Sequence, residues 1–392
     1  MSHKLINHSP DLKKLRDAGY EIEIRNGHLL VHSIPYVTPG KQIALGTLVC
    51  VLSLGGERTA KPPDHTAHFS GETPCDKNGS AIKGIINSSE RKILAEGVEV
   101  CHYFSAKPPS GNYADYHEKV STYVTIIESH AQSVDPSVSA KTHKVIGVTD
   151  QDTAFHYIDT NSSRAEIMAI SEKLSGLKIA IIGLGGTGSY ILDFVAKTPV
   201  KEIHLFDKDY FLSHNAFRAP GAPSLTKLEE SPTKVRYLCD VYSQMHKHII
   251  PHEYHIDDST SGELLEMDFV FVCIDQSEVK KSIIEKLNEL SIPFVDTGIG
   301  IIVIDNALTG GVRVTTGTSE KNDHIKKMIP FAHNGNDDYN KNIQIAELNA
   351  LNAVLAIIKW KKLFGFYHDL EKEHNTVYDI NVNKLLNNET VS

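Results

Sequence analysis

Residues 178–209 read KIAIIGLGGTGSYILDFVAKTPVKEIHLFDKD, and the order of their patterns indicates the fold class. An apolar strand pattern leads into a glycine loop, a helix pattern and a second strand that ends in an acidic pair. In the loop, Gly183, Gly185 and Gly188 form the pattern GxGxxG between a strand and a helix, which is the context that this motif requires. Glycine allows the backbone to turn tightly and approach a phosphate, and the helix N-terminus offers free N–H groups. The stretch therefore predicts a nucleotide-binding α/β unit.

The rest of the sequence places this unit in a chain of two domains. At 392 residues the chain is long for one domain. Residues 1–145 contain several strand runs between two helix patterns, which predicts a smaller α+β domain with a meander-like sheet. Residues 160–392 alternate strands and helices, which predicts a Rossmann-like α/β domain with a mostly parallel sheet. The strands expected in this second domain are 178–184, 202–207, 252–256, 269–274 and 293–299, and the expected helices are 186–197, 233–247, 278–290 and a last one with Leu348, Leu351, Leu355 and Ile358 on its apolar stripe.

Composition and charge narrow the class of protein. The net charge is −9 with histidine neutral, which argues against nucleic acid as the main partner, because binding to its backbone needs a basic face. No apolar run approaches the roughly 18 residues that suggest a membrane span, and no signal peptide is expected. The cysteines are spread along the chain without a Cys-x-x-Cys pair, so we expect no structural zinc and a reducing, cytoplasmic location.

An acidic residue follows the glycine loop at the distance that ribose recognition requires. Asp207 closes the second strand, 24 residues after Gly183, where a carboxylate accepts hydrogen bonds from ribose hydroxyls. By themselves, the loop and this carboxylate favour an NAD-dependent dehydrogenase.

The residues that follow favour a nucleoside triphosphate instead. Arg218 and Lys234, the latter in the first turn of a helix, are suited to neutralise phosphates. Asp275 stands at the carboxyl end of a strand, the edge at which open α/β sheets bind ligands. Together with Asp209 it would hold Mg²⁺, which needs only one or two carboxylates and keeps several waters. A nicotinamide site has no use for these additional charges.

With these residues in place, the second domain resembles the ThiF/MoeB and ubiquitin-activating adenylyltransferases. That family carries a loop of the form GxGGxGS, a D-x-D strand end, N-x-x-R, a lysine at a helix start and a late strand-end aspartate, in this order. The matching residues are Gly183, Gly185, Gly186, Gly188 and Ser189 of the loop, then Asp207, Asp209, Asn215, Arg218, Lys234 and Asp275.

The resemblance implies an ATP- and Mg²⁺-dependent reaction in which the C-terminal glycine of a ubiquitin-like protein is adenylated. It also implies a homodimer, or a dimer-like pair, in which an arginine ahead of the first sheet strand reaches the ATP phosphates, and Arg164 matches this arginine. The catalytic residues that it implies are Arg164, Arg218, Lys234 and Asp275. No general base is required, because a C-terminal carboxylate is already ionised at neutral pH.

The cysteines depart from the pattern of those family members that form a thioester, which place a cysteine beyond the late aspartate. Here the last one, Cys273, precedes Asp275 in an apolar strand, and Cys239 lies on an apolar helix face. In the first domain Cys75 falls in a loop and Cys101 in a strand run, without the His-Pro-Asn sequence of conjugating enzymes. We therefore expect residues 1–145 to recognise a partner or assist dimerisation, with a conjugating-enzyme-like role as the alternative.

Several functions remain open at this point. The first is activation of a ubiquitin-like protein in a bacterial conjugation pathway, with a conjugating enzyme as a further partner. The second is adenylation of a sulfur-carrier protein in cofactor biosynthesis. An NAD-dependent oxidoreductase, a non-catalytic adenylate-binding scaffold and a tRNA-modifying dehydratase are weaker alternatives, and the acidic charge disfavours the last.

Overall fold

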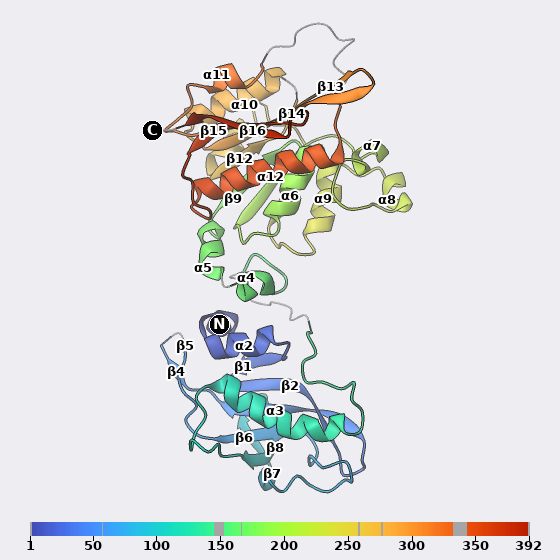
Figure 1. The fold of residues 1–392 in the computed structure, drawn as a ribbon, viewed down its shortest axis with the longest axis vertical. Helices are drawn as coiled ribbons and strands as arrows, with labels where there is room; N and C mark the ends of the chain where they lie inside the picture. Colours follow the sequence, from blue (N-terminus) through green and yellow to red (C-terminus); the bar gives the residue numbers. More distant parts are fainter. Residues whose placement is uncertain are drawn as a thin grey trace. The chain divides into compact units, whose positions relative to one another are not determined.

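The computed structural model describes residues 2–56, 58–144, 153–165, 167–257, 259–275, 277–331 and 343–390. They form two compact units (Figure 1). The first comprises Met1–Asp150 with Tyr157–Glu166, and the second comprises Gln151–His156 with Ile167–Ser392. In the described residues, no helix is both long and apolar enough to cross a membrane.

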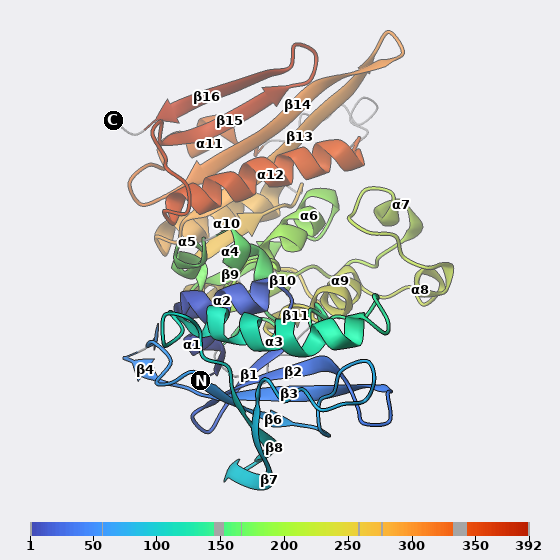
Figure 2. The ribbon, with the colours of Figure 1, turned by 60° about the horizontal axis from the view of Figure 1, so that its bottom comes forward.

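The first unit is an antiparallel sheet of six strands with helices beside it (Figure 2). In sheet order the strands are β1 (Ile22–Arg25), β2 (His28–Val37), β3 (Ile43–Val51), β6 (Thr66–Ser70), β8 (Val98–Ser105) and β7 (Ile86–Ala95). A separate two-stranded ribbon consists of β4 (Leu54–Gly55) and β5 (Arg58–Thr59), and the helices are α1 (Ser2–His8), α2 (Pro10–Asp17), α3 (Tyr116–Gln132) and α4 (Thr160–Arg164).

The helix α3 covers the sheet of the first unit through an apolar face of helical period. Its carboxylate cap is Asp115, which accepts a hydrogen bond from the Glu118 N–H at 2.8 Å. The buried residues Tyr116, Val120 and Tyr123 recur at steps of three and four along α3. They join the side chains of the sheet in one apolar core.

The second unit is an eight-stranded sheet, and its parallel part confirms the predicted Rossmann-like α/β fold. In sheet order the strands are β11 (Ile249–His252), β10 (Glu202–Phe206), β9 (Lys178–Ile182), β12 (Phe269–Val272), β13 (Phe294–Ile304), β14 (Ala307–Gly317), β15 (Glu373–Asp379) and β16 (Lys384–Thr390). The strands β11 to β13 pair in parallel, whereas β14 to β16 extend the sheet in antiparallel pairs. One predicted strand was misplaced: residues 252–256 overlap β11 only at its last residue, because β11 uses the apolar residues before Pro251 to pair with β10.

Helices cover both faces of this second sheet. They are α5 (Met168–Ser171), α6 (Gly186–Val195), α7 (Ser213–Ala216), α8 (Leu225–Glu229), α9 (Lys234–Tyr242), α10 (Ser277–Glu289), α11 (Ile325–Met328) and α12 (Ala346–Leu363), with the short 3₁₀ turns η1 (Glu172–Leu174) and η2 (Ser261–Glu266). The central strand β9 shows the two layers, because side chains alternate across a strand. Ile179 and Ile181 join the core with α6, α9 and α12, whereas Ala180 and Ile182 join the core with α10 and α11.

The buried face of α12 confirms most of the predicted stripe but not its last residue. Ile358 is exposed, whereas Asn349, Asn352 and Trp360 are fully buried. Three residues of the predicted stripe do face the interior: Leu348 is buried, and Leu351 and Leu355 are partly buried against the apolar cores. The buried face also includes two asparagines that apolar periodicity does not mark, because their amides find hydrogen-bond partners inside the unit. These hydrogen bonds place two amide side chains beside the site described below.

Candidate nucleotide site

A cavity of about 720 Å³ opens at the carboxyl ends of the parallel strands of the second unit. This is the edge at which open α/β sheets bind ligands. The predicted site residues that line it are Gly183, Gly185, Gly186, Asp207, Asp209, Arg218, Lys234 and Asp275. The structure therefore brings together side chains that are up to 92 positions apart in the chain, from Gly183 to Asp275.

The glycine loop requires glycine at two positions, Gly183 and Gly188, for different reasons. Gly183 has φ +90°, a conformation that L side chains rarely adopt. A Cβ on Gly188 would lie 1.9 Å from the Gly183 carbonyl oxygen, so only glycine allows the loop to close on the first turn of α6. A Cβ on Gly185 would meet no atom within 4 Å, since this residue borders the cavity. The loop thus presents the N-terminus of α6 to whatever occupies the cavity.

Gly188 and Ser189 support the shape of the loop without lining the cavity. Ser189 is fully buried, and its hydroxyl donates to the Gly186 carbonyl at 2.8 Å. Gly186 lies against Asn349 of α12, whose Oδ1 accepts a hydrogen bond from Thr187 at 2.9 Å. Gly188 and Ser189 therefore hold the loop, and neither is among the residues that line the cavity.

Asp207 joins the end of β10 to the glycine loop. Its Oδ2 accepts a hydrogen bond from the Leu184 N–H at 2.7 Å, and its Oδ1 accepts one from the Asp209 N–H at 2.8 Å. The carboxylate is only 5% exposed. Each carboxylate oxygen can accept more than one hydrogen bond, so Asp207 keeps capacity for a ribose hydroxyl.

Lys234 balances the charge of the acidic pair. It begins α9, and its Nζ lies 2.8 Å from Asp209 Oδ2 and 3.3 Å from Asp207 Oδ2. Its backbone N–H donates to the Asp209 carbonyl at 2.8 Å, which fixes the start of α9 beside the acidic pair. The hydrogen bond from Lys234 lowers the pKa of Asp209. Lys234 is 8% exposed, so its ammonium is held at the cavity by these partners.

Arg218 and Asn215 contribute donors without internal acceptors. The Nε of Arg218 and the Nδ2 of Asn215 are buried, and neither has a hydrogen-bond partner among the described residues. Burial lowers the pKa of the Arg218 guanidinium, and the nearby carboxylate of Asp275 opposes that shift. Asn215 lies behind the cavity, where its Oδ1 accepts from the Leu212 N–H at 2.9 Å. Buried donors without acceptors are rare in native proteins, and an anion in the cavity would give the Arg218 guanidinium an acceptor.

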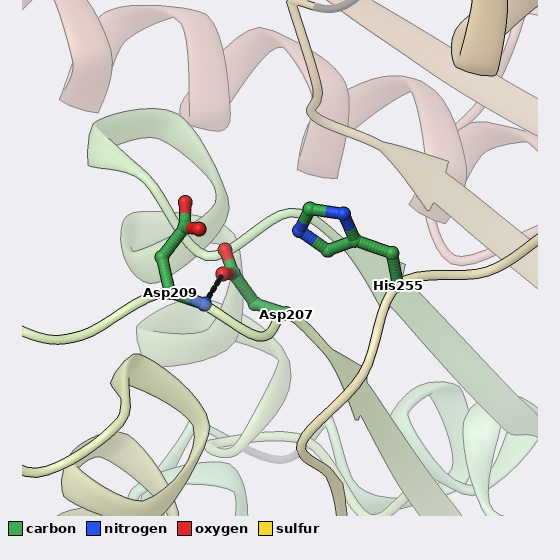
Figure 3. Close-up of side chains that lie close together, drawn as sticks. All are labelled: Asp207, Asp209 and His255. Atoms are coloured by element: carbon green, nitrogen blue, oxygen red, sulfur yellow. Dashed lines mark hydrogen bonds between the residues drawn. The ribbon is translucent and has the colours of Figure 1, made fainter.

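The acidic residues also suggest where a metal ion would lie. Among the described residues, Asp207, Asp209 and His255 bring ligand atoms within 4.8 Å of one another (Figure 3). Mg²⁺ prefers oxygen ligands, and Lys234 already pairs with both carboxylates, so this cluster is a poor magnesium site. Asp275 is exposed on the cavity wall and fits a hydrated Mg²⁺ better.

Arg164 lies in the first unit and not among the cavity residues. It ends α4, and its Nη2 donates to the Asp17 carbonyl at 2.9 Å. The neighbouring Ser163 hydroxyl donates to the Asp17 carboxylate at 2.9 Å. Both interactions tie residues just ahead of the second sheet to α2 of the first unit.

Two of the cysteines, Cys75 and Cys273, lack the features of nucleophiles. Cys75 was expected in an accessible loop, but its side chain is buried between short bridges to Val37 and Ala81, and burial raises the pKa of its thiol. Cys273 lines the cavity, where burial raises the pKa of its thiol to about 12. A thiol with a raised pKa carries little thiolate at neutral pH, so neither residue fits a thioester role.

Sequence reasoning missed several cavity residues. His255 follows β11 by three positions and belongs to no motif. Lys280, Arg313 and Asn352 come from α10, β14 and α12, and all three line the cavity. No short-range pattern marks them, because they meet only when the helices pack on the sheet.

Comparisons with known proteins match this chain in two parts. A family model described as "ThiF family" matches residues 160–383, more than half of the chain. A second model, described as "Domain of unknown function (DUF6791)", matches residues 10–160.

The curated relatives include ubiquitin-like modifier-activating enzyme 5 from several animals. The Gallus gallus and Xenopus laevis proteins are each 26% identical to this chain over 162 residues, which are 38% of this chain and 40% of each relative. The Mus musculus protein is 26% identical over 178 residues, 43% of this chain and 40% of the relative. The chain thus matches about 40% of the length of these relatives.

Solved structures with partial similarity include two proteins. A crystal structure of E. coli MccB with MccA-N7isoASN has a TM-score of 0.49 at 16% identity and covers 59% of this chain and 73% of that one. The structure of selenomethionine PaaA has a TM-score of 0.46 at 14% identity and covers 57% of this chain and 76% of that one.

Proposed function

Because this chain belongs to the ThiF family, we propose that its second unit catalyses ATP-dependent adenylation of a carboxylate. In this reaction a carboxylate oxygen attacks the α-phosphorus of ATP, an acyl-adenylate forms, and pyrophosphate leaves. Membership of the family supports this class of reaction in general. The substrate and the roles of individual residues are further parts of the proposal.

One observation carries the proposal: a single cavity joins a glycine loop, a strand-end carboxylate and two cationic side chains. The N–H groups at the start of α6 would receive the phosphates, and Asp207 would accept the ribose hydroxyls. Arg218 and Lys234 would hold the triphosphate and oppose the negative charge that grows as pyrophosphate departs. A nicotinamide-dependent hydride transfer has no such need for cations, which disfavours the oxidoreductase alternative.

The substrate carboxylate needs no base, because it is ionised at neutral pH. The task of the protein is therefore to position this carboxylate and to neutralise charge. Magnesium would be held by Asp275, with Asp209 as a second ligand through Oδ1, because Lys234 pairs with its Oδ2. The ion would supply charge neutralisation at the phosphates. The proposal includes a homodimer in which Arg164 reaches the ATP phosphates.

We propose the C-terminal glycine of a ubiquitin-like protein as the substrate, within a bacterial ubiquitin-like conjugation pathway in the cytoplasm. The name of the curated relatives, ubiquitin-like modifier-activating enzyme 5, supports this choice over other carboxylates. A conjugating enzyme would then receive the activated protein, and the first unit would recognise one of these partners. Adenylation of a sulfur-carrier protein is the alternative with the same chemistry.

ATP–pyrophosphate exchange tests the proposal directly. The full chain is incubated with labelled pyrophosphate, ATP, Mg²⁺ and small β-grasp proteins, each ending in glycine and encoded beside its gene. Exchange that depends on the protein's last glycine is expected, and a version lacking that glycine is the control. Exchange with none of these proteins, together with no stabilisation by ATP and Mg²⁺, would contradict the proposal. Copurified nicotinamide cofactor would favour the oxidoreductase instead.

A further inference from the structure

A second polar group lines the same cavity from different elements. Lys280 of α10 and Arg313 of β14 both pair with Asp296 of β13. The Lys280 Nζ lies 2.9 Å from Asp296 Oδ1, and the Arg313 Nη2 lies 2.7 Å from Asp296 Oδ2. Asp296 is fully buried, whereas both cations line the cavity.

The charges of this group do not cancel. Two cations share one carboxylate, so this group by itself carries one excess positive charge, and the other carboxylates of the cavity, Asp207, Asp209 and Asp275, come from other elements. A charge in a poorly hydrated place is costly unless a partner of opposite sign binds it. An anionic group in the cavity would therefore complete this cluster.

The backbone of Gly298 lies against the Arg313 guanidinium. Gly298 is the cross-strand partner of Arg313, and a Cβ on Gly298 would stand 2.7 Å from Arg313 Nη2. The guanidinium therefore lies directly against the Gly298 backbone, a position that only glycine permits without a shift of the arginine. Gly298 itself lines the cavity.

Asn352 adds an acceptor at the same place. Its Nδ2 donates to the Gly298 carbonyl at 3.2 Å, which orients the amide, because only its nitrogen can donate to a carbonyl. Its Oδ1 is buried and accepts no hydrogen bond from the described residues, and Asn352 also lines the cavity. Gly298 therefore contacts two side chains of the cavity: the guanidinium of Arg313, and the amide of Asn352, whose Oδ1 has no hydrogen-bond donor among the described residues.

We propose that Arg313 and Asn352 bind the terminal residue of the substrate polypeptide. The guanidinium binds the free carboxylate, and the Asn352 Oδ1 accepts the amide N–H of the same residue, which is one Cα away from that carboxylate. Asp296 and Thr315, whose side chains accept hydrogen bonds from Arg313, orient its fork. This assignment rests on the proposed function and adds to it the residues that distinguish a polypeptide terminus from other carboxylates.

The test measures binding of two synthetic peptides to the full chain in the presence of a non-hydrolysable ATP analogue. Both peptides end in Gly-Gly; one has a free carboxylate and the other a C-terminal amide. We expect the wild-type protein to bind the free carboxylate about 10- to 100-fold more tightly than the amide, because the carboxylate makes charge-assisted hydrogen bonds. Arg313→Gln should reduce this ratio to within about 2-fold.

Further variants separate binding from a merely structural role. Asn352→Leu should weaken both peptides equally, because both carry the amide N–H. Gly298→Ala keeps every charge but displaces the guanidinium, so it should lower the acid-to-amide ratio as Arg313→Gln does. The matched control is Arg236→Gln, which removes an exposed arginine of α9 that pairs with Glu253. This control should leave the ratio unchanged.

Three results would overturn the inference: equal wild-type binding of the two peptides, no detectable binding of either, or an acid-to-amide ratio that survives in both Arg313→Gln and Gly298→Ala. Each of these leaves the proposed function intact as long as the wild-type protein binds the ATP analogue. If the wild-type protein did not bind the ATP analogue at all, that result would instead contradict the proposed function itself.

Discussion

Lys234 holds two carboxylates together at the cavity. The replacement Lys234→Ala removes a cation from the phosphate site and leaves Asp207 and Asp209 to repel each other. We expect adenylation to fall about 10²- to 10³-fold, as for the loss of one well-placed charge in a transition state. The pKa of Asp209 should rise, because the hydrogen bond that lowers it is lost.

Pyrophosphate exchange measures the first effect, and titration followed by NMR measures the second. Lys281→Ala, on the exposed side of α10, is the control and should retain full exchange. Undiminished exchange in Lys234→Ala would show that the cation has no part in the reaction.

Different glycines of the loop serve folding and ATP binding, and two variants can distinguish these roles. Gly188→Ala should cost more than about 2 kcal/mol of unfolding free energy, because its Cβ would overlap the Gly183 carbonyl. Gly185→Ala should change that free energy by less than about 0.5 kcal/mol, since its Cβ enters open space. That space is the cavity, so Gly185→Ala should weaken ATP binding instead.

Urea unfolding and thermal stabilisation by ATP and Mg²⁺ distinguish these two variants. If Gly185→Ala bound ATP as tightly as the wild-type protein, the phosphates would not approach the loop as proposed.

The helix α12 is held by one large side chain. Trp360 is fully buried among Phe269, Phe271 and Phe364. Trp360→Ala should lower the unfolding free energy of the second unit by about 3–5 kcal/mol. Its Nε1 is buried without a partner among the described residues, so Trp360→Phe should cost much less. Equal losses for the two variants would show that ring volume does not hold α12.

Protonation of buried histidines should contribute to the loss of stability in acid. Burial lowers the pKa of His246 from its ordinary 6.5 to about 4. Its Nε2 donates to the Val200 carbonyl at 3.0 Å and its Nδ1 accepts the His248 N–H at 3.2 Å, so both ring nitrogens are matched to the neutral form. Burial also lowers the pKa of His68 and His102 in the first unit.

Below pH 6.5 the unfolded chain binds protons that the folded chain excludes, so stability must fall as pH drops from 6.5 toward 4. For His246 alone the loss at pH 5 is about 2 kcal/mol. His246→Gln should be less stable at pH 7 but lose about 2 kcal/mol less between pH 7 and pH 5. Urea unfolding at both pH values measures this, with the exposed His368→Gln as the control. An unchanged pH slope in His246→Gln would contradict the argument.

The sequence by itself determined the features that depend on near neighbours. The strand, loop and helix around Gly183 could be predicted from local periodicity and glycine. The place of Asp207 beside the loop could be predicted because the next strand of the same strand–helix–strand segment pairs in parallel with β9. The order of motifs through Asp275 identified the family. Strand ends were less predictable, as the displacement of β11 shows, since pairing with β10 chose its residues.

Only the tertiary structure decided which distant side chains share the cavity. Lys280, Asp296 and Arg313 lie on three elements and meet through strand pairing and helix packing. The tertiary structure also determined that the buried face of α12 includes Asn349 and Asn352, because other elements supply hydrogen-bond partners for their amides. Local sequence records the preference of each residue for an element, but a hydrogen bond or ion pair between elements exists only after the chain has folded.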